Sequence, residues 1–307
     1  MKKIGKEQVR KARQTLAKYK EGKAVLDKRI VSNEQWWKLR HWGEIGCDKD
    51  DTRPMPASAW LFNSLANKHA DAMDNIPEPT VLPREKSDEE VAKQLSLILP
   101  AILERCGYEK LYSDGWWYKL KNGSMCTAVV WDPDADGGMG DIAIRNADIL
   151  NLFWEPGIKD IEESANLFYV TLVDRERLNL MYPELLGEDT ESVAGGTGNV
   201  EKYKTEDKTD DSAKVEVIDW YYKKTINGRK QLCYCKFCGD RVIYSSEDDE
   251  SCADGFYKHS RYPFVMDTLF VQEGTPCGFG YIDVMRDAQM YICLLYTSPS
   301  PRDRTRS

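Results

Sequence analysis

The sequence lacks the segments that mark membrane and secreted proteins. No apolar run approaches the roughly 20 residues that a helix needs to span a bilayer. The basic start MKKIGKEQVRKARQTLAKYK lacks the apolar core of a secretory signal peptide. We therefore expect a protein made in a reducing cytoplasm, with no membrane partner. Its nine cysteines fit buried thiols, because their spacing is irregular and 307 residues can form a core without disulfides.

Motifs of enzyme chemistry are also scarce. The phosphate-binding pattern GxxxxGK[ST] does not occur, and AGGTGNVEK has neither its spacing nor a preceding strand, which disfavours an ATPase. Histidine occurs only as His41, His69 and His259, and no nucleophile elbow is present, which disfavours acyl transfer. His69 falls in an Ala/Asn-rich helical pattern, where a hydrogen-bonded structural role is the commoner one. We expect no catalytic residue, no cofactor and no enzymatic activity.

The charge is distributed unevenly. Residues 1–30 hold eleven Lys and Arg against three acids, and residues 293–307 hold three Arg against one Asp, which leaves a net charge of −18 on residues 31–292. Such an acidic body does not attract a phosphate backbone, so a DNA-reading domain is disfavoured there. The basic segment 1–32 predicts either a helix or a solvated, fraying arm.

Helical patterns follow in residues 33–122. NEQWWKLRHW places Trp36, Trp37 and Trp42 close together, too much apolar surface to leave in water. PASAWLFNSLANKHADAMDN predicts an amphipathic helix, with Trp60, Leu61 and Leu65 on one side.

Two further helices complete this segment. Ser87 and Glu90 predict a capping box ahead of the apolar positions of the first. Pro100 is expected to kink or split that helix. YEKLYSDGWWYKL, from Tyr108, predicts another short helix.

Strand patterns fill residues 123–280. β-branched and aromatic runs bounded by Gly, Asp, Asn and Pro predict a mainly antiparallel sheet: CTAVVWDP, DIAIR, ILNLFWEPG, LFYVTLVDR, VEVIDWYYKK, KQLCYCK and RVIYS. A short helix, RERLNLMYPEL, interrupts them, and the polar, Gly-rich segment 187–214 predicts a mobile loop. The fold class is therefore α+β, with N-terminal helices followed by the sheet.

Two clusters raise the question of a metal site. Cys235 and Cys238 are spaced like half of a zinc knuckle, but a structural site needs two more ligands. The available ones, Cys252, His259 and Cys277, have the spacing of no common zinc ribbon. We expect no bound metal and keep Cys235 and Cys238 as the candidate ligands.

The second cluster, DPDADGGMGD, resembles the start of a calcium loop, with Asp132, Asp134 and Asp136 before Gly137. Ala143 stands where a calcium loop needs a bidentate glutamate. The pattern therefore favours a hairpin connection between two strands.

The order of several segments resembles tailed-bacteriophage portal proteins, the head-tail connectors. The resemblance covers Asn33 to Ile292 and rests on five stretches, although NGSMC departs from the family's more Gly-rich turn: NEQWWKLRHW, WLFNSLANKHADAMDNIPEP, YSDGWWYKLKNGSMCTAVVWDP, ILNLFWEPG and YPFVMDTLFVQEGTPCGFGYIDVMRDAQMYI. It implies a wing-like domain over 123–280 and the start of a long inner helix at 281–292.

The last residues, 293–307, differ from the rest. CLLYTSPSPRDRTRS resembles a translated sequencing adapter at the end of a metagenomic fragment. We expect this tail to pack against nothing, and expect the stem, clip and crown of a portal to be missing. Residues 1–292 alone would then associate only weakly.

The resemblance implies a structural subunit of a homo-oligomeric ring, usually of twelve copies, at one capsid vertex of the virion. Double-stranded DNA would pass through the ring during packaging and ejection. Implied partners are the terminase large subunit, the major capsid and scaffolding proteins and the head-completion proteins, with assembly in the host cytoplasm. Two alternatives stay open: a zinc-stabilised nucleic-acid-binding module and another minor phage structural protein.

Overall fold

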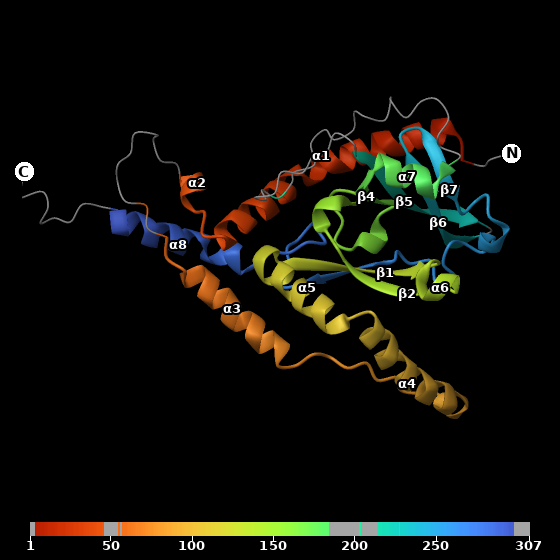
Figure 1. The fold of residues 1–307 in the computed structure, drawn as a ribbon, viewed down its shortest axis with the longest axis horizontal. Coiled ribbons are helices and arrows are strands. Elements are labelled where there is room, and N and C mark those ends of the chain that lie inside the picture. The colour runs from red at the N-terminus through yellow and green to blue at the C-terminus, as the bar shows by residue number, and fades with distance from the viewer. Residues whose placement is uncertain are drawn as a thin grey trace, which may run out of the picture. The chain divides into compact units, whose positions relative to one another are not determined.

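The computed structural model describes residues 4–45, 55, 57–183, 203, 214–226 and 228–297 (Figure 1). Helices come first and antiparallel strands later, so the predicted α+β class is confirmed. The loop expected at 187–214 lies outside the described residues, except at its positions 203 and 214. Among the helices in the described ranges, none is both long enough and apolar enough to cross a membrane.

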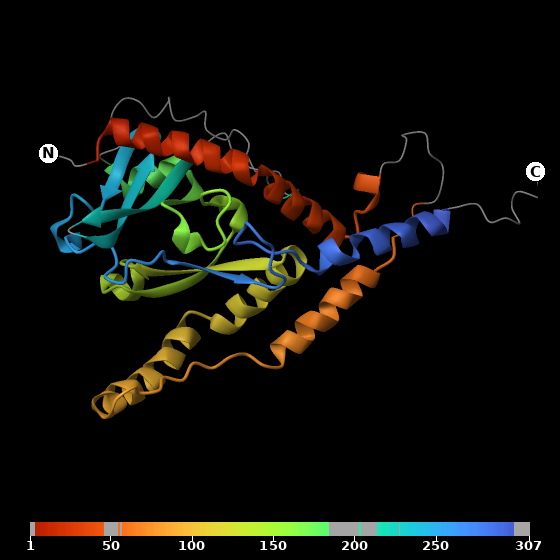
Figure 2. The ribbon, with the colours of Figure 1, turned by 180° about the vertical axis from the view of Figure 1, so that it is seen from behind.

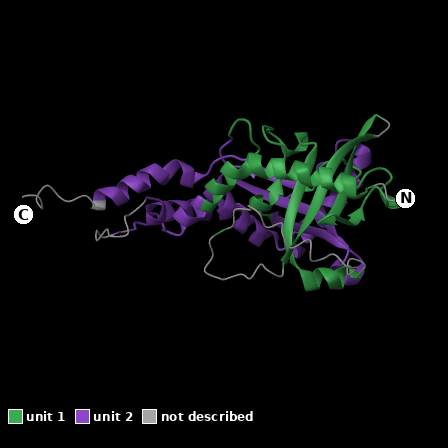
Figure 3. Ribbon diagram, turned by 90° about the horizontal axis from the view of Figure 1, so that it is seen from above, with its two compact units in different colours: residues 1–31, 147–263, 272–276 green, residues 32–146, 264–271, 277–307 purple. Residues whose placement is uncertain are grey.

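The chain forms two compact units that alternate along the sequence (Figure 3). Unit 1 holds residues 1–31, 147–263 and 272–276, and unit 2 holds the remainder. This division differs from the consecutive segments 33–122 and 123–280 that the patterns suggested. The cause is long-range strand pairing, because the strand near residue 126 pairs with a strand near residue 266.

Unit 1 is built on a five-stranded antiparallel sheet with the strand order β3-β4-β5-β6-β7. Its elements are α1 (Lys6–Trp37, up to Val31 in this unit), η2 (Ile149–Asn151), β3 (Leu152–Phe153), η3 (Ile161–Glu163), β4 (Asn166–Asp174), α7 (Arg175–Met181), β5 (Lys214–Ile226), β6 (Arg229–Cys238), β7 (Arg241–Ser245) and η6 (Glu250–Cys252). The strands coincide with the runs predicted from the sequence.

Helix α1 is packed, so from Lys6 onward the basic N-terminal segment forms a helix and not a fraying arm. Val9, Ala12, Leu16 and Tyr19 recur at three- and four-residue spacing and are buried. They join one core cluster with Phe168 and other side chains of the sheet. Figures 1 and 2 show this part of α1 lying along the sheet.

A buried cation also fixes α1. Lys23 Nζ donates to the carbonyl oxygen of Ile149 and lies 3.0 Å from Asp27 Oδ1. It stands 4.3 Å from the centre of the Phe153 ring. A buried ammonium needs such partners, because its desolvation is costly. The basic residue Lys23 therefore serves packing.

Unit 2 combines helices with a three-stranded sheet of order β2-β1-β8. Its elements are the end of α1 from Ser32, α2 (Trp42–Ile45), α3 (Trp60–Met73), η1 (Lys86–Asp88), α4 (Glu89–Arg105), α5 (Tyr108–Asn122), β1 (Ser124–Asp132), α6 (Ala135–Gly138), β2 (Asp141–Ala147), β8 (Phe264–Thr268) and α8 (Tyr281–Thr297). Trp36, Leu61, Leu65, Leu120 and Ile282 form its helical core.

Three details of unit 2 differ from the sequence expectations. Trp60 is 67% exposed, because it is the first residue of α3 and lies about 100° around the helix from Leu61. Helix α4 begins after Asp88, and Ser87 Oγ bonds to Asp88 Oδ1 in the preceding turn, so the capping box is not formed. Pro100 lies inside α4 without splitting it.

The acidic segment 132–141 connects two neighbouring strands, as predicted. Strands β1 and β2 are hydrogen-bonded neighbours. Asp132 of β1 accepts a 2.6 Å bond from Arg145 of β2, so its carboxylate links the two strands. The hairpin connection is confirmed.

The last helix continues beyond the predicted boundary. Helix α8 includes Cys293 to Thr297, and Cys293 is fully buried. The expectation that the tail packs against nothing is therefore wrong for Cys293. Residues 298–307 lie outside the described part of the chain.

Three glycines allow backbone segments of unit 2 to cross where α8 begins. A Cβ atom at Gly123 would lie 2.2 Å from the carbonyl carbon of Phe279. At Gly278 it would lie 2.0 Å from the Phe270 oxygen, and at Gly280 2.6 Å from the Lys121 oxygen. Real Cβ atoms do not approach backbone so closely. Only glycine fits this crossing.

We predict that Gly278→Ala destabilises the protein by about 1–3 kcal/mol or more, because the added methyl group meets backbone that cannot move aside. The matched control is Gly43→Ala in α2, where a Cβ atom has no neighbour within 4 Å. Urea unfolding of both variants measures the difference. Equal stability of the two variants would contradict the crossing.

Candidate functional site

The candidate metal ligands Cys235 and Cys238 lie on opposite faces of the five-stranded sheet. Cys235 belongs to the core cluster that includes α1, whereas Cys238 packs with Leu178 and Val217 on the other side. Burial raises the pKa of Cys235 to about 12, with a smaller contribution from Glu247, and burial also raises the pKa of Cys238. Both groups are therefore protonated core thiols, and they do not converge on one ion.

The other proposed zinc ligands do not complete a site. Cys252 lies near Tyr244, His259 is exposed and accepts a bond from the backbone of Arg261, and Cys277 belongs to unit 2. Within the described ranges, no group of three or more His, Cys, Asp or Glu could hold a metal ion. The geometry gives the zinc alternative no support.

The two histidines of unit 2 have structural partners. His41 is buried, stacks on Trp36 with ring centres 4.7 Å apart, and its Nε2 donates to the Trp36 carbonyl. Burial lowers the pKa of His41, so the neutral ring is favoured. His69 stacks on Trp117 with ring centres 3.8 Å apart and contacts the backbone oxygen of Ser113. The histidines are not assembled into a catalytic group.

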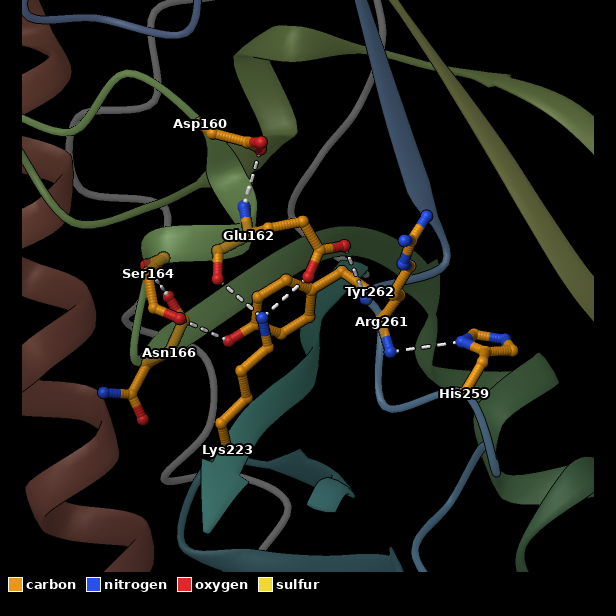
Figure 4. Close-up of polar contacts among 8 residues, drawn as sticks. All are labelled: Asp160, Glu162, Ser164, Asn166, Lys223, His259, Arg261 and Tyr262. Atoms are coloured by element: carbon orange, nitrogen blue, oxygen red, sulfur yellow. Dashed lines mark hydrogen bonds and ion pairs between the residues drawn. The ribbon is translucent and has the colours of Figure 1, made fainter. Parts of the chain in front are cut away.

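A buried polar network surrounds Tyr262 in unit 1 (Figure 4). The Tyr262 hydroxyl donates to the carbonyl of Ser164 at 2.7 Å, and the Tyr262 amide donates to Glu162 Oε1 at 3.0 Å. Lys223 Nζ bonds to the Glu162 carboxylate at 2.7 Å and stands 4.3 Å from the centre of the Tyr262 ring. Burial, and then the Glu162 charge, raise the pKa of Tyr262, so the hydroxyl remains a donor.

Short turns position these groups. Asp160 accepts a bond from the Glu162 amide and so caps η3. The Ser164 hydroxyl donates to the Asn166 carbonyl, and the Asn166 side chain accepts from the Trp220 indole at 2.9 Å. Because its proton is used in a backbone bond, Ser164 is not activated as a nucleophile. The network joins η3 and the start of β4 to Tyr262, which lies in the segment between η6 and β8.

A second buried network seats α8 in unit 2. Asn33, which is fully buried, donates to the Lys121 carbonyl and to Asp283 Oδ1, each at 3.2 Å. Its oxygen accepts a 2.6 Å bond from Arg286, and Asp283 accepts from the amide of Gly280. One side chain at the end of α1 thus joins α5 to the first turns of α8.

Neighbouring contacts add to the network that holds α8. Lys121 and Glu34 form a largely buried ion pair at 2.6 Å. Gln289 of α8 accepts a bond from the Leu61 amide and donates to Ser58. Sequence reasoning missed all of these polar groups, because isolated Asn, Asp and Gln residues leave no periodic signal.

We predict that Asn33→Ala destabilises the protein by about 2–3 kcal/mol, because the partly buried side chains of Arg286 and Asp283 each lose a hydrogen-bond partner. Asn63→Ala on the exposed side of α3 is the control and should change stability little. Thermal unfolding and proteolysis within α8 measure the effect. A loss no larger than that of the control would show that Asn33 does not hold α8.

For the two thiols, we predict that joint Cys235→Ser and Cys238→Ser substitution costs about 1–3 kcal/mol of packing free energy and releases no zinc. Elemental analysis of protein purified without chelators, together with urea unfolding, tests both parts. Stoichiometric zinc in the unaltered protein would contradict the prediction.

Comparison with known families identifies the chain. Residues 70–254 match the sequence model of the phage P22-like portal protein family. The matched range runs from α3 through η6 and contains the entire five-stranded sheet. No match is found among curated proteins. The match spans more than half of the 307 residues, and it agrees with the α+β order of the elements. The chain therefore belongs to the P22-like family of phage portal proteins.

Proposed function

We propose that the chain is the subunit of the portal ring through which phage double-stranded DNA is packaged and ejected. The observation that carries this proposal is the family match over residues 70–254. Membership of the family gives the chain a structural role in a phage portal and implies a homo-oligomeric ring in the phage capsid.

The electrostatics support a conduit. The chain has a net charge of −8, and its excess of Lys and Arg lies in residues 1–30. Tight DNA binding requires many Lys and Arg contacts to phosphates. An acidic body instead lets DNA slide past, as a channel requires.

The side-chain geometry supports a structural role. Among the described residues, the buried polar groups around Tyr262 and Asn33 bond to backbone and to one another. In this proposal, ATP hydrolysis belongs to a separate partner, the terminase large subunit. The ring, of usually twelve copies, would sit at one capsid vertex of the virion after assembly in the host cytoplasm. It would contact capsid, scaffolding and head-completion proteins.

The proposal predicts that the 307-residue chain associates weakly head to tail and forms closed rings of one size only at high protein concentration. A head-to-tail contact that did not close would give filaments. Sedimentation velocity at high protein concentration and negative-stain microscopy after mild cross-linking test this. ATP turnover should be absent. A stable monomer under these conditions, or hydrolysis of ATP by the chain itself, would contradict the proposal.

A further inference from the structure

We propose that an apolar stripe on α4 docks onto the outer face of α1 in a second copy of the chain. The α4 stripe consists of Val91, Leu95 and Ile98. The inference rests on the proposed ring and names surfaces by which neighbouring copies would meet.

Helix α4 is apolar on two sides, and its own unit covers one of them. Ala92 is buried, and Ser96 on the same side binds the backbone of Val81 through its hydroxyl at 3.0 Å. The α4 stripe faces another way, with Val91 56%, Leu95 41% and Ile98 51% exposed. The four- and three-residue spacing places these side chains in one row. A row of this kind favours a partner that removes it from water.

The charges beside the α4 stripe select a basic partner. Asp88, Glu89 and Glu90 are exposed in the turn immediately before Val91. In a chain with a net charge of −8, residues 1–30 carry a net charge of +8. A second copy therefore offers the required positive charge on α1.

The outer face of α1 has both features that the α4 stripe needs. Its inner face, with Leu16 and Tyr19, is buried in the core of unit 1. On the outer side, Val25 is 82% exposed, and Lys18 and Lys28 are exposed before and after it. Of the two acids in this stretch, Asp27 is buried beside Lys23 and Glu21 is exposed, so the exposed positive charges outnumber the exposed negative ones.

The spacing of the two surfaces is compatible. With Leu95 opposite Val25, Glu90 lies five residues along α4, which is about 7.5 Å along the helix axis. In an antiparallel contact Glu90 lies near Lys28, which is about 4.5 Å along α1 from Val25. In a parallel contact the exposed acid Glu21, about 6 Å from Val25, is nearer to Glu90 than Lys18, which is about 10.5 Å away. The charges therefore favour the antiparallel contact, with Lys28 beside the acidic turn.

The two surfaces are different patches of the same chain, which is the requirement for a head-to-tail contact. Each copy would use its α4 stripe on one neighbour and its α1 face on the other. Repetition of such a contact gives a ring when the rotation closes.

Photo-cross-linking of the 307-residue chain tests the contact directly. A benzophenone amino acid replaces Leu95 in one preparation and Ile98 in another, and labelled chain is mixed equally with ¹⁵N-labelled chain of the same variant. Illumination and mass spectrometry should find links to residues 18–28. About half of these links should join light to heavy chains, since partners are chosen at random. Unchanged melting temperatures show that the variants fold.

Charge-reversal variants are the second part of the experiment. Glu89→Lys with Glu90→Lys should lower the yield of the Leu95 link at least about fivefold, as expected from like-charge repulsion. Adding Lys28→Glu should restore much of the yield. Glu104→Lys on another side of α4 is the matched control and should leave the yield unchanged.

The outcomes separate this inference from the proposed function. Rings that form without links from α4 to α1, or links found only within one chain, overturn the inference and leave the ring intact. A chain that neither associates nor cross-links overturns both. Links between copies that the charge reversal does not weaken also overturn the inference, because its choice of partner rests on charge.

Discussion

The close backbone crossing at Gly123, Gly278 and Gly280 is the constraint on which unit 2 depends. It brings the end of α5 against the segment that leads into α8, and the Leu269 amide bonds to the Gly123 carbonyl at 2.8 Å. Backbone contacts alone therefore constrain where α8 begins. The hydrogen bonds of Asn33 and the apolar contact of Ile282 add to this constraint within the first turns of the helix.

Helix α1 has a buried apolar face and an exposed basic face. Its charge left open either a helix or a solvated, fraying arm; the structure shows a helix in which Leu16 and Tyr19 pack in the core and Lys23 is buried against an aromatic ring. The apolar residues of α1 recur once per turn, so they occupy one side of the helix and leave most of the Lys and Arg residues on the other. Burial of one face and a basic outer surface are thus compatible within a single helix.

Local periodicity predicted the elements well and their partners poorly. The alternation in VEVIDWYYKK and KQLCYCK is enough to identify strands β5 and β6. Because a short hairpin connects them, their pairing also follows from the sequence. No local pattern shows that Ser124 pairs with Thr268, since nothing in either strand records the register across 144 residues. The division into two alternating units, and both polar networks, depend on such distant contacts.

The spacing of the two cysteines illustrates the same limit for function. Two intervening residues let a pair of cysteines share an ion in a tight turn. In strand β6, however, side chains alternate between faces, so Cys235 and Cys238, three positions apart, point to opposite faces. The irregularity between Lys236 and Phe237 does not bring them together. A motif therefore carries chemistry only in the backbone conformation that the chemistry needs. The described polar and apolar groups of this portal protein serve mainly to pack its elements together, which explains why segment order was a better guide to its family than any set of reactive groups.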